Sequence, residues 1–395
     1  MTDALVESVV GDAPPGAKPR GVYLAGDTTN PTVILRITSL INAGCEVSAY
    51  TFRRHKFNTG FQPAWRNTPL GETVDRKYKL RVPALLRACF TIARNTRDFR
   101  GADFIYARLF DVALLALFGR WWSGSKARFI YEVEDVQAVF FETTFAAALF
   151  RWLERRVLAR TKLLVLMSPG FLRGYFEPVQ KYRGATFVLE NKIQLPLPLS
   201  APKPEASRWR DVRNKWIIGW NGTLRCARSL EMLSAIAERL GDRVEIQTRG
   251  HPTENGLDHF MQVVNRHPNW RHGGEYTIPD DLEAMYGGVH FSWCFDYLDP
   301  QGNSPLLLAC RMYQGGYYGA VPLLAAGSEM ERFLKPHRIG HAFAEPAIDQ
   351  VCDFLANLTW DDYARERERV SGLGATLFLD TGDDARKLVR LVTAR

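Results

Sequence analysis

The feature that most constrains this fold is a pattern that runs twice along the chain and is interrupted once. Short apolar runs bounded by Gly, Asp or Asn alternate with longer amphipathic stretches, first over 20–194 and again over 213–375. Between them, 195–209 reads LPLPLSAPKPEASRW, whose four prolines break both helical and strand periods. The alternation is typical of parallel β/α units, and 395 residues are too many for one core. The sequence therefore predicts an α/β protein with two Rossmann-like, doubly wound parallel-sheet domains facing across a cleft.

The expected domains follow from these breaks. They are a flexible tail at 1–19, an N-terminal domain at 20–194, a linker at 195–212, a C-terminal domain at 213–375, and a last helix within 376–395 that is free to pack on the N-terminal domain. Strands are predicted near 20–25, 46–51, 103–107, 128–132, 162–167, 184–189, 216–223, 243–248, 269–273, 289–293, 320–325 and 340–343. Helices are predicted near 30–43, 80–97, 110–120, 143–160, 228–240, 255–266, 279–286, 305–318, 328–335, 346–357 and 382–394.

The net charge of +8 is divided unequally between the halves. Residues 1–200 hold 28 Lys and Arg against 17 Asp and Glu, an excess of 11, whereas 201–395 hold 23 against 26, a deficit of 3. Most of the excess lies in 53–100, with 12 basic and 3 acidic residues. Such a field attracts phosphates, anionic membranes or nucleic acid, and a solvated surface is the alternative. LRVPALLRACFTIAR at 80–94 fits an interfacial helix as well as a helix packed on the sheet with its arginines outside.

Cysteine usage and hydropathy indicate the compartment. The six cysteines form no CxxC pair and no Cys/His cluster, so neither a disulfide scaffold nor a zinc site is expected. Residues 1–20 lack a signal-peptide pattern, and no stretch approaches the roughly 20 apolar residues that span a bilayer. These patterns predict a cytoplasmic protein whose contact with a membrane, if it has one, is peripheral.

A candidate phosphate site opens the second half. The apolar strand WIIGWNGT at 216–223 ends in a glycine turn at Gly222, and a helix follows. A glycine turn before a helix N-terminus lets backbone N–H groups approach an anion. Arg225 and Arg228 add charge-assisted donors for a diphosphate. The alternative is an ordinary βα turn.

A second constellation is NSPLLLACRMYQGGYYGAVPLL at 303–324. Arg311 and Gln314 stand three residues apart and so share one face of the expected helix. Ser304 is expected at the start of that helix. Polar groups beside a helix N-terminus suit a nucleotide, and a solvated helix face is the alternative.

Candidate residues for the acceptor side lie in the first half. The strand FIYEV delivers Glu134 and Asp135 to the carboxyl edge of its sheet, where ligands bind in such folds. A carboxylate there can deprotonate an acceptor hydroxyl, but Asp135 could instead cap the following helix. Asp27 and Thr28 follow the first strand, and there too the alternative is a helix cap, provided by Asp27 or by Asn30.

The motifs of the second half resemble those of bacterial GT-B glycosyltransferases of exopolysaccharide assembly. The resemblance covers about 150 residues of the C-terminal domain and rests on its order of signals. These are IIGWNGTLRCAR at 217–228, VEIQTRG at 244–250, NWRHGGEYTIPDDLEAMYGGVHFSWCFDY at 269–297 and RMYQGGYYGAVPLL at 311–324. GVYLAGDTTN at the start and FVLENKI at 187–193 also resemble glycosyltransferases of succinoglycan-type polymers.

Within that group, the chain is similar to the glucuronosyltransferases of xanthan assembly. Arg311 and Gln314 stand eight and five residues before Gly319, where those enzymes have a Lys and a Gln that contact UDP. Asp135 follows Tyr131 by four, as their catalytic Asp follows a Tyr. The resemblance implies a UDP-sugar donor whose uridine lies near hydrophobic side chains, here Leu224 and Tyr276.

The resemblance also implies a chemistry. Many retaining GT-B enzymes carry two Glu seven residues apart, but Leu306 and Gln314 occupy these positions here, which favours inversion with Asp135 as the base. No cofactor and no metal are expected, because this fold stabilises the departing diphosphate with basic residues and a helix N-terminus. The expected acceptor is a saccharide, either lipid-linked or soluble. The basic stretch 53–100 favours the lipid-linked form, because it would hold the protein at the anionic inner face of the cell membrane. The implied donor-binding residues are Gly222, Thr223, Leu224, Arg225, Arg228, Tyr276, Ser304, Arg311 and Gln314, and those on the acceptor side are Asp27, Thr28 and Glu134.

Two other classes of function remain open at this point. One is a GT-B-shaped nucleotide-sugar epimerase, which needs no acceptor. The other is a non-enzymatic membrane- or nucleic-acid-binding protein, although the basic residues are not arranged in a recognisable nucleic-acid motif.

Overall fold

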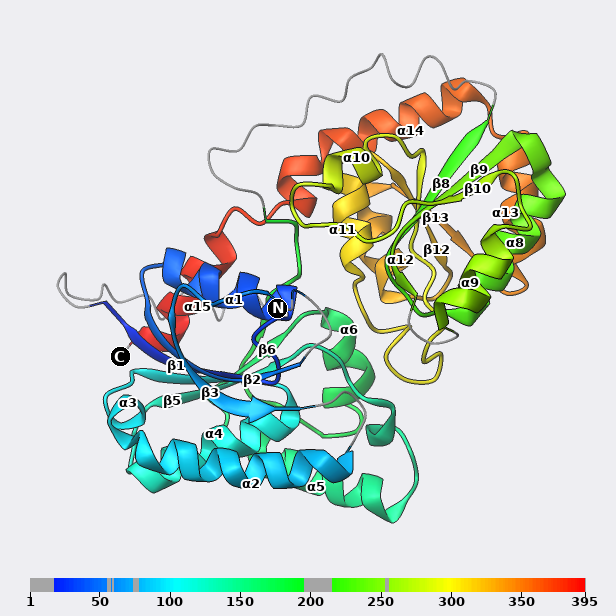
Figure 1. Ribbon diagram of the computed structural model, residues 1–395. Coiled ribbons are helices and arrows are strands. Elements are labelled where there is room, and N and C mark those ends of the chain that lie inside the picture. The colour runs from blue at the N-terminus through cyan, green and yellow to red at the C-terminus, as the bar shows by residue number, and fades with distance from the viewer. Residues whose placement is uncertain are drawn as a thin grey trace. The chain divides into compact units, whose positions relative to one another are not determined.

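A computed structural model describes residues 18–54, 58, 60–73, 78–194, 215–252 and 256–394. The chain divides into two compact units, the first reaching Glu190 and resuming at Thr381, the second comprising Asn191–Asp380 (Figure 1). The final helix α15 (Asp383–Thr393) therefore belongs to the first unit. The predicted linker at 195–212 lies outside the described residues, as does all but the last two residues of the predicted tail.

The first unit is built on a seven-stranded parallel sheet. Its strand order is β3-β2-β1-β4-β5-β6-β7, which reverses direction between β1 and β4. The strands are β1 (Arg20–Ala25), β2 (Glu46–Arg53), β3 (Arg66–Glu72), β4 (Phe104–Arg108), β5 (Arg128–Val133), β6 (Leu163–Leu166) and β7 (Thr186–Val188). Ligands of such sheets bind beyond the carboxyl ends of the strands near this reversal.

Helices cover both faces of this sheet, which explains why its central strands are continuous apolar runs. Helix α1 (Pro31–Asn42) and α15 cover one face, while α2 (Tyr78–Arg94), α4 (Phe110–Ser123) and α5 (Phe145–Leu158) cover the other (Figure 1). Helix α1 begins at the side chain of Asn30, whose Oδ1 accepts from the Thr32 amide at 2.9 Å, and at Pro31, which suits a first helical position. The core on this side joins α1 and α15 to the stacked rings of Tyr23 and Tyr106, 5.1 Å apart.

The second unit repeats the design with a six-stranded parallel sheet. Its order is β10-β9-β8-β11-β12-β13, with the reversal between β8 and β11. The strands are β8 (Trp216–Leu224), β9 (Val244–Pro252), β10 (Trp270–His272), β11 (Phe291–Trp293), β12 (Val321–Ala325) and β13 (His341–Phe343). The helices that place the site are α8 (Ala227–Leu240), α10 (Leu282–Tyr286) and α11 (Cys310–Tyr317); α9 (Gly256–Val264), α12 (Glu329–Leu334), α13 (Ala347–Asn357) and α14 (Trp360–Gly372) complete the unit.

The prediction of two doubly wound parallel sheets is confirmed, and each predicted strand is present within a few residues of its expected bounds. Two longer elements were missed, besides the short helices α3 (Thr96–Arg100) and α6 (Pro169–Phe171). Strand β3 is a polar edge strand that contains Pro69, and α14 is a charged helix whose apolar face is narrow.

One predicted helix start was wrong. The helix expected at 305–318 begins only at Cys310, so Ser304 is not at its start. Pro305 disfavours helical geometry at Ser304, and the Asp299 carboxylate instead accepts from the Asn303 amide at 3.0 Å, which holds this segment in turns.

Candidate functional site

The predicted turn at Gly222 is wrong, because β8 runs through Gly222 to Leu224 and pairs there with β9, and the chain leaves the strand only at Arg225. Gly222 has φ of +111°, and a Cβ placed there would lie 3.8 Å from the Tyr276 hydroxyl. Gly250, its partner in the ladder between β8 and β9, has φ of +130°, and a Cβ there would lie 1.8 Å from the Gly222 carbonyl oxygen. Only glycine fits both places, and the result is an open stretch of backbone in front of Tyr276.

Arg311 is fixed in place at the beginning of α11. Its Nη2 donates to Asp296 Oδ2 at 3.3 Å and to the Phe295 carbonyl at 3.2 Å. Ser304 Oγ donates to the other oxygen of Asp296 at 2.5 Å, so the predicted donor residues Ser304 and Arg311 share one carboxylate. Arg311 is 12% exposed, and its buried Nε has no hydrogen-bond partner among the described residues. The guanidinium is thus preorganised while one donor stays available.

Gln314 and Tyr276 lie in the same neighbourhood as Arg311. Gln314 Oε1 accepts from the hydroxyl of the buried Tyr286 at 3.2 Å. Burial raises the pKa of Tyr276 to about 12, an effect that the nearby positive charge of Arg311 partly offsets. The structure therefore brings together Gly222, Tyr276, Arg311 and Gln314, which were selected from segments far apart in the sequence.

Arg228 is held by carboxylates instead. It lies in the first turn of α8, where its guanidinium contacts Glu345 at 3.1 Å and Glu231 at 3.6 Å. Burial alone would raise the pKa of Glu345, but hydrogen bonds from Tyr297 and Arg228 outweigh it and lower that pKa. These two carboxylates therefore compete with a diphosphate for the Arg228 guanidinium.

The remaining donor-side residues follow Gly222 in the chain. Leu224 is buried in the core at the end of β8, while Thr223 and Arg225 are half-buried. The Arg225 amide donates to the Thr223 carbonyl at 3.0 Å, which tightens the turn before α8.

Sequence reasoning missed Arg249 and Asp296. Arg249 Nη2 donates to the Glu275 carbonyl at 2.8 Å and its amide donates to Asn221 Oδ1 at 3.0 Å, so it links β8 to the loop that carries Tyr276. Arg249 lies within β9 and Asp296 lies three residues after the end of β11, and no local sequence pattern distinguishes either residue.

In the first unit, Asp135 is exposed just after β5. The N-cap positions of the next two helical segments are occupied by Gln137 and Thr144, so the interpretation of Asp135 as a helix cap is wrong. Asp135 lines a small hollow of about 10 Å³, together with Tyr131 and Glu154. The space suits a single water-sized group.

Glu134 is the half-buried neighbour of Asp135 and is held from two sides. Arg108, at the end of β4, lies 2.9 Å from Glu134 and also donates to Thr32 Oγ1 at 2.8 Å. Thr32 Oγ1 in turn lies 3.1 Å from Glu134 Oε1 and 2.7 Å from Asn30 Oδ1, and its single proton is donated to one of these acceptors. These contacts join the N-terminus of α1 to the carboxyl ends of β4 and β5.

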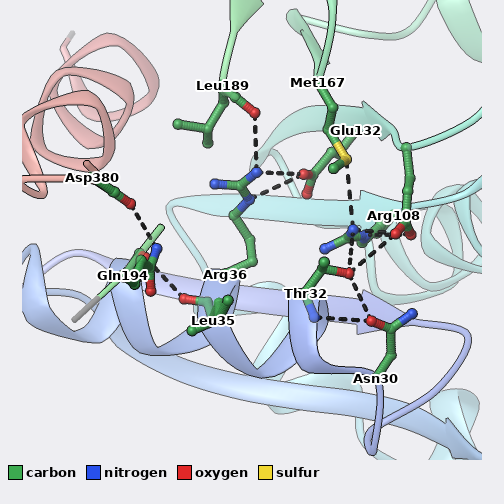
Figure 2. Close-up of polar contacts among 12 residues, drawn as sticks. Asn30, Thr32, Leu35, Arg36, Arg108, Glu132, Met167, Leu189, Gln194 and Asp380 are labelled. Carbon is green, nitrogen blue, oxygen red and sulfur yellow. Dashed lines mark hydrogen bonds and ion pairs between the residues drawn. The ribbon is translucent and has the colours of Figure 1, made fainter. Parts of the chain in front are cut away.

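Beneath this network lies a fully buried ion pair. Arg36 of α1 contacts Glu132 of β5 at 3.0 Å, and its Nη2 donates to the Leu189 carbonyl at 3.2 Å (Figure 2). Burial would raise the pKa of Glu132, but the positive charges of Arg36 and Arg108 outweigh this effect and hold its pKa below the ordinary value. The carboxylate is therefore ionised and acts as a support for the site.

The turn after β1 holds Asp27 and Thr28. Asp27 Oδ1 accepts from the Thr29 amide at 3.0 Å and from the Arg54 amide at 3.1 Å, so this carboxylate organises the loop. Asn30 caps α1. Thr28 is buried, and its hydroxyl has no hydrogen-bond partner among the described residues.

Two features of the described residues bear on cofactors and membranes. In that part of the chain, no three His, Cys, Asp or Glu side chains are grouped so that they could hold a metal ion. None of its helices is both long and apolar enough to cross a bilayer. The expectation of a metal-independent reaction stays a prediction.

Comparison with known proteins places these features in context. No protein-family profile matches the chain. The chain is similar to the succinoglycan biosynthesis protein ExoL of Rhizobium meliloti (strain 1021), with 30% identity over 378 residues that cover 93% of this chain and 92% of that protein.

Solved structures resemble it over nearly its whole length. HepE of Anabaena, in complex with UDP and glucose, has a TM-score of 0.70 at 12% identity over 95% of this chain and 100% of that one. Sucrose-phosphate synthase of Thermosynechococcus elongatus has a TM-score of 0.70 at 13% identity over 95% and 98%. At these identities the likeness establishes the fold, and the expected GT-B fold is confirmed.

Proposed function

Because this chain belongs to the family of the succinoglycan biosynthesis protein ExoL and has the fold of the GT-B glycosyltransferases, we propose that it transfers a sugar from a UDP-linked donor to a saccharide acceptor in exopolysaccharide synthesis. The observation that carries the proposal is the grouping of Gly222, Tyr276, Arg311 and Gln314 in the second unit. HepE, which shares the fold, was solved with UDP and with UDP-glucose.

The donor is proposed to lie with its uracil near Tyr276 and its diphosphate over Gly222 and Arg311. The Arg311 guanidinium supplies charge-assisted donors for a diphosphate, and the absence of a side chain at Gly222 leaves space beside Tyr276. Gln314 lies on α11 with Arg311, while Thr223 and Arg225 lie at the end of β8 and just after it. Arg228 is proposed to contact the diphosphate after its ion pair with Glu345 breaks.

Replacing Arg311 by alanine is expected to weaken UDP binding about 10- to 100-fold, the worth of a lost hydrogen bond to a charged group. Calorimetric titration of UDP measures the change. Arg332→Ala is the matched control, because Arg332 is an exposed arginine in the same unit, 3.7 Å from Glu329. An unchanged UDP affinity in Arg311→Ala would move the donor site elsewhere.

The loss of Arg311 also removes the partner of Asp296, so a structural effect must be separated from a binding effect. Asp296→Asn keeps the shape and the guanidinium but loses the ion pair. We expect this variant to lose thermal stability while it keeps more of its UDP affinity than Arg311→Ala.

The reaction is proposed to be a single displacement with inversion. The acceptor oxygen attacks the anomeric carbon, the bond from that carbon to the UDP oxygen breaks, and Asp135 takes the proton of the acceptor hydroxyl. Arg311, with Arg225 and Arg228, stabilises the charge that develops on the departing UDP in place of a metal ion. Glu134, Asp27 and Thr28 are proposed to border the acceptor.

The acceptor is proposed to be a saccharide linked to a lipid at the inner face of the cell membrane, with the enzyme cytoplasmic and in peripheral contact with anionic lipid. The basic excess of the first half of the sequence supports this placement.

Incubation with radiolabelled UDP-sugars, with and without lipids extracted from an exopolysaccharide-producing membrane, tests the activity. We expect label to enter the organic phase only when lipid is present. A new nucleotide sugar formed from the donor alone would identify an epimerase and contradict the proposal.

A further inference from the structure

Three helices on one face of the first sheet expose large apolar side chains to solvent. On α5, Phe145, Leu149 and Trp152 recur at helical spacing on the outer side, and Phe145 is 86% exposed. At the end of α4, Trp121 is 72% exposed and lies beside Trp122, with ring centroids 6.0 Å apart. Exposed side chains of this size and number are costly on a surface that meets only water.

Helix α2 shows the same feature on its outer side. Its inner side packs through Ala84, Ala88 and Ile92, which are buried, whereas Leu86 and Phe90 are exposed. The helix therefore packs on the sheet, as one of the two interpretations of 80–94 expected, and it also presents an apolar outer side. The interfacial interpretation stays a prediction.

These helices are neighbours in space. Helix α4 packs against both α2 and α5, and all three lie on the same side of the sheet (Figure 1). We call the outer side chains Leu86, Phe90, Trp121, Trp122, Phe145 and Trp152 the aromatic face. Among the described residues, all exposed large apolar side chains except Ile41 belong to these three helices, and the second unit has none.

Among the described side chains of α2, α4 and α5, the exposed charged residues are all basic. Arg87, Arg94, Arg155 and Arg156 are exposed on α2 and α5, and the Arg156 guanidinium lies 4.8 Å from the Trp152 ring centroid. The acidic residues of these helices are already engaged: Asp111 pairs with Arg81, and Glu154 is buried and accepts from Tyr131 and Tyr175. The exposed surface is thus apolar and cationic.

We propose that the aromatic face docks this chain on a bilayer that contains anionic phospholipid. Tryptophan and phenylalanine favour the boundary between headgroups and acyl chains, and arginines around them pair with lipid phosphates while their stems remain in apolar surroundings. A second copy of the chain is a poorer occupant, because two surfaces with the same positive charge repel each other. The inference deepens the proposed membrane contact, on which it rests, by assigning it to the outer sides of α2, α4 and α5.

The test is sedimentation of the purified full chain with vesicles of phosphatidylcholine, with and without phosphatidylglycerol. We expect binding to the anionic vesicles, weakened by salt, and little binding to the neutral ones. Trp121→Ser/Trp122→Ser and, on another helix, Phe145→Ser/Trp152→Ser should each lower the partition coefficient about tenfold or more. Arg155→Glu/Arg156→Glu should lower it on anionic vesicles only.

Ile41→Ser is the matched control, because Ile41 is an exposed apolar residue of α1, on the opposite face of the sheet. It should bind vesicles as the wild type does. Thermal midpoints check that the variants remain folded, since these side chains are exposed and support little of the core.

Several outcomes would overturn the inference. They are absence of wild-type binding to anionic vesicles, unchanged binding in both paired aromatic variants, or a wild-type dimer in light scattering that these substitutions convert to a monomer. UDP titration of the same samples separates the two proposals. If the protein binds UDP but not vesicles, only the membrane-docking proposal is contradicted. If it binds vesicles but not UDP, the proposed UDP-sugar donor is contradicted and the docking proposal stands.

Discussion

Replacing Asp135 by asparagine should lower the rate of sugar transfer about 10²- to 10⁴-fold, the usual contribution of a general base. Asparagine keeps the size of the side chain and its place after β5, but it cannot accept a proton from the acceptor hydroxyl. UDP affinity should not change, because the proposed donor contacts all come from the second unit. Single-turnover transfer and UDP calorimetry measure these two quantities on the same sample.

Glu142→Gln provides the comparison, since Glu142 is an exposed acid in the same unit, seven residues further along. It should transfer at the wild-type rate. Turnover retained by Asp135→Asn would exclude Asp135 as the base, and the half-buried Glu134 beside it would become the next carboxylate to test.

The second large effect is expected in stability, at the pair of Arg36 and Glu132. Both side chains are buried, and Glu132→Gln leaves a buried positive charge without its counterion. Breaking such a pair from one side costs about 3–5 kcal/mol in free energy of unfolding. Urea denaturation followed by a probe in the first unit measures the loss.

The same pair gives a pH dependence with a definite sign. The folded-state pKa of Glu132 lies below its ordinary value of 4.5, so the ionised carboxylate stabilises the fold fully above that pH. As the pH falls below 4.5 and through the lower folded-state pKa, this contribution is lost. The stability gap between wild type and Glu132→Gln should therefore be constant at about pH 6 to 8 and narrow in acid.

Glu177→Gln is the control for this experiment, because Glu177 pairs with the largely exposed Arg183 at 3.8 Å. A solvent-exposed pair contributes little, so this substitution should leave the unfolding curve almost unchanged. A gap between wild type and Glu132→Gln that widens in acid would contradict the assignment of Glu132 as ionised.

The fold could be predicted from the sequence because its signals are local. Each buried parallel strand is an apolar run ended by a turn residue, and each helix has its own period. The exceptions are elements whose local sequence predicted a different structure. Strand β3 is polar and so lacks the apolar run of a buried strand. The segment before α11 was predicted to be helical, but Pro305 and the Asp299 carboxylate hold it in turns.

The candidate site was predicted only in part. Gly222, Arg311 and Gln314 could be found because a glycine near the end of an apolar strand and a helix face are local patterns. The supports could not be found, because Arg36 and Glu132 are 96 residues apart, and Arg108 and Thr32 are 76 apart. From the sequence alone, an arginine within an amphipathic helix is predicted to lie on the surface. Only the fold shows that a carboxylate lies opposite it.

The aromatic face escaped prediction for a related reason. Phe145, Leu149 and Trp152 have the spacing of a core-facing stripe, and periodicity does not tell which side of a helix faces the sheet. The structure shows that α5 packs through Ala147, Glu154 and Val157, which leaves the bulkier apolar side chains outside.

We expect a nucleotide diphosphate to bind to the second unit over Gly222 and α11. Hydrogen–deuterium exchange of the full chain, with and without saturating UDP, tests it most directly. Peptides covering 221–228 and 310–317 should exchange more slowly with UDP, while those covering the strands of the first unit should not change. Protection confined to the first unit, or none at all at saturation, would contradict the account.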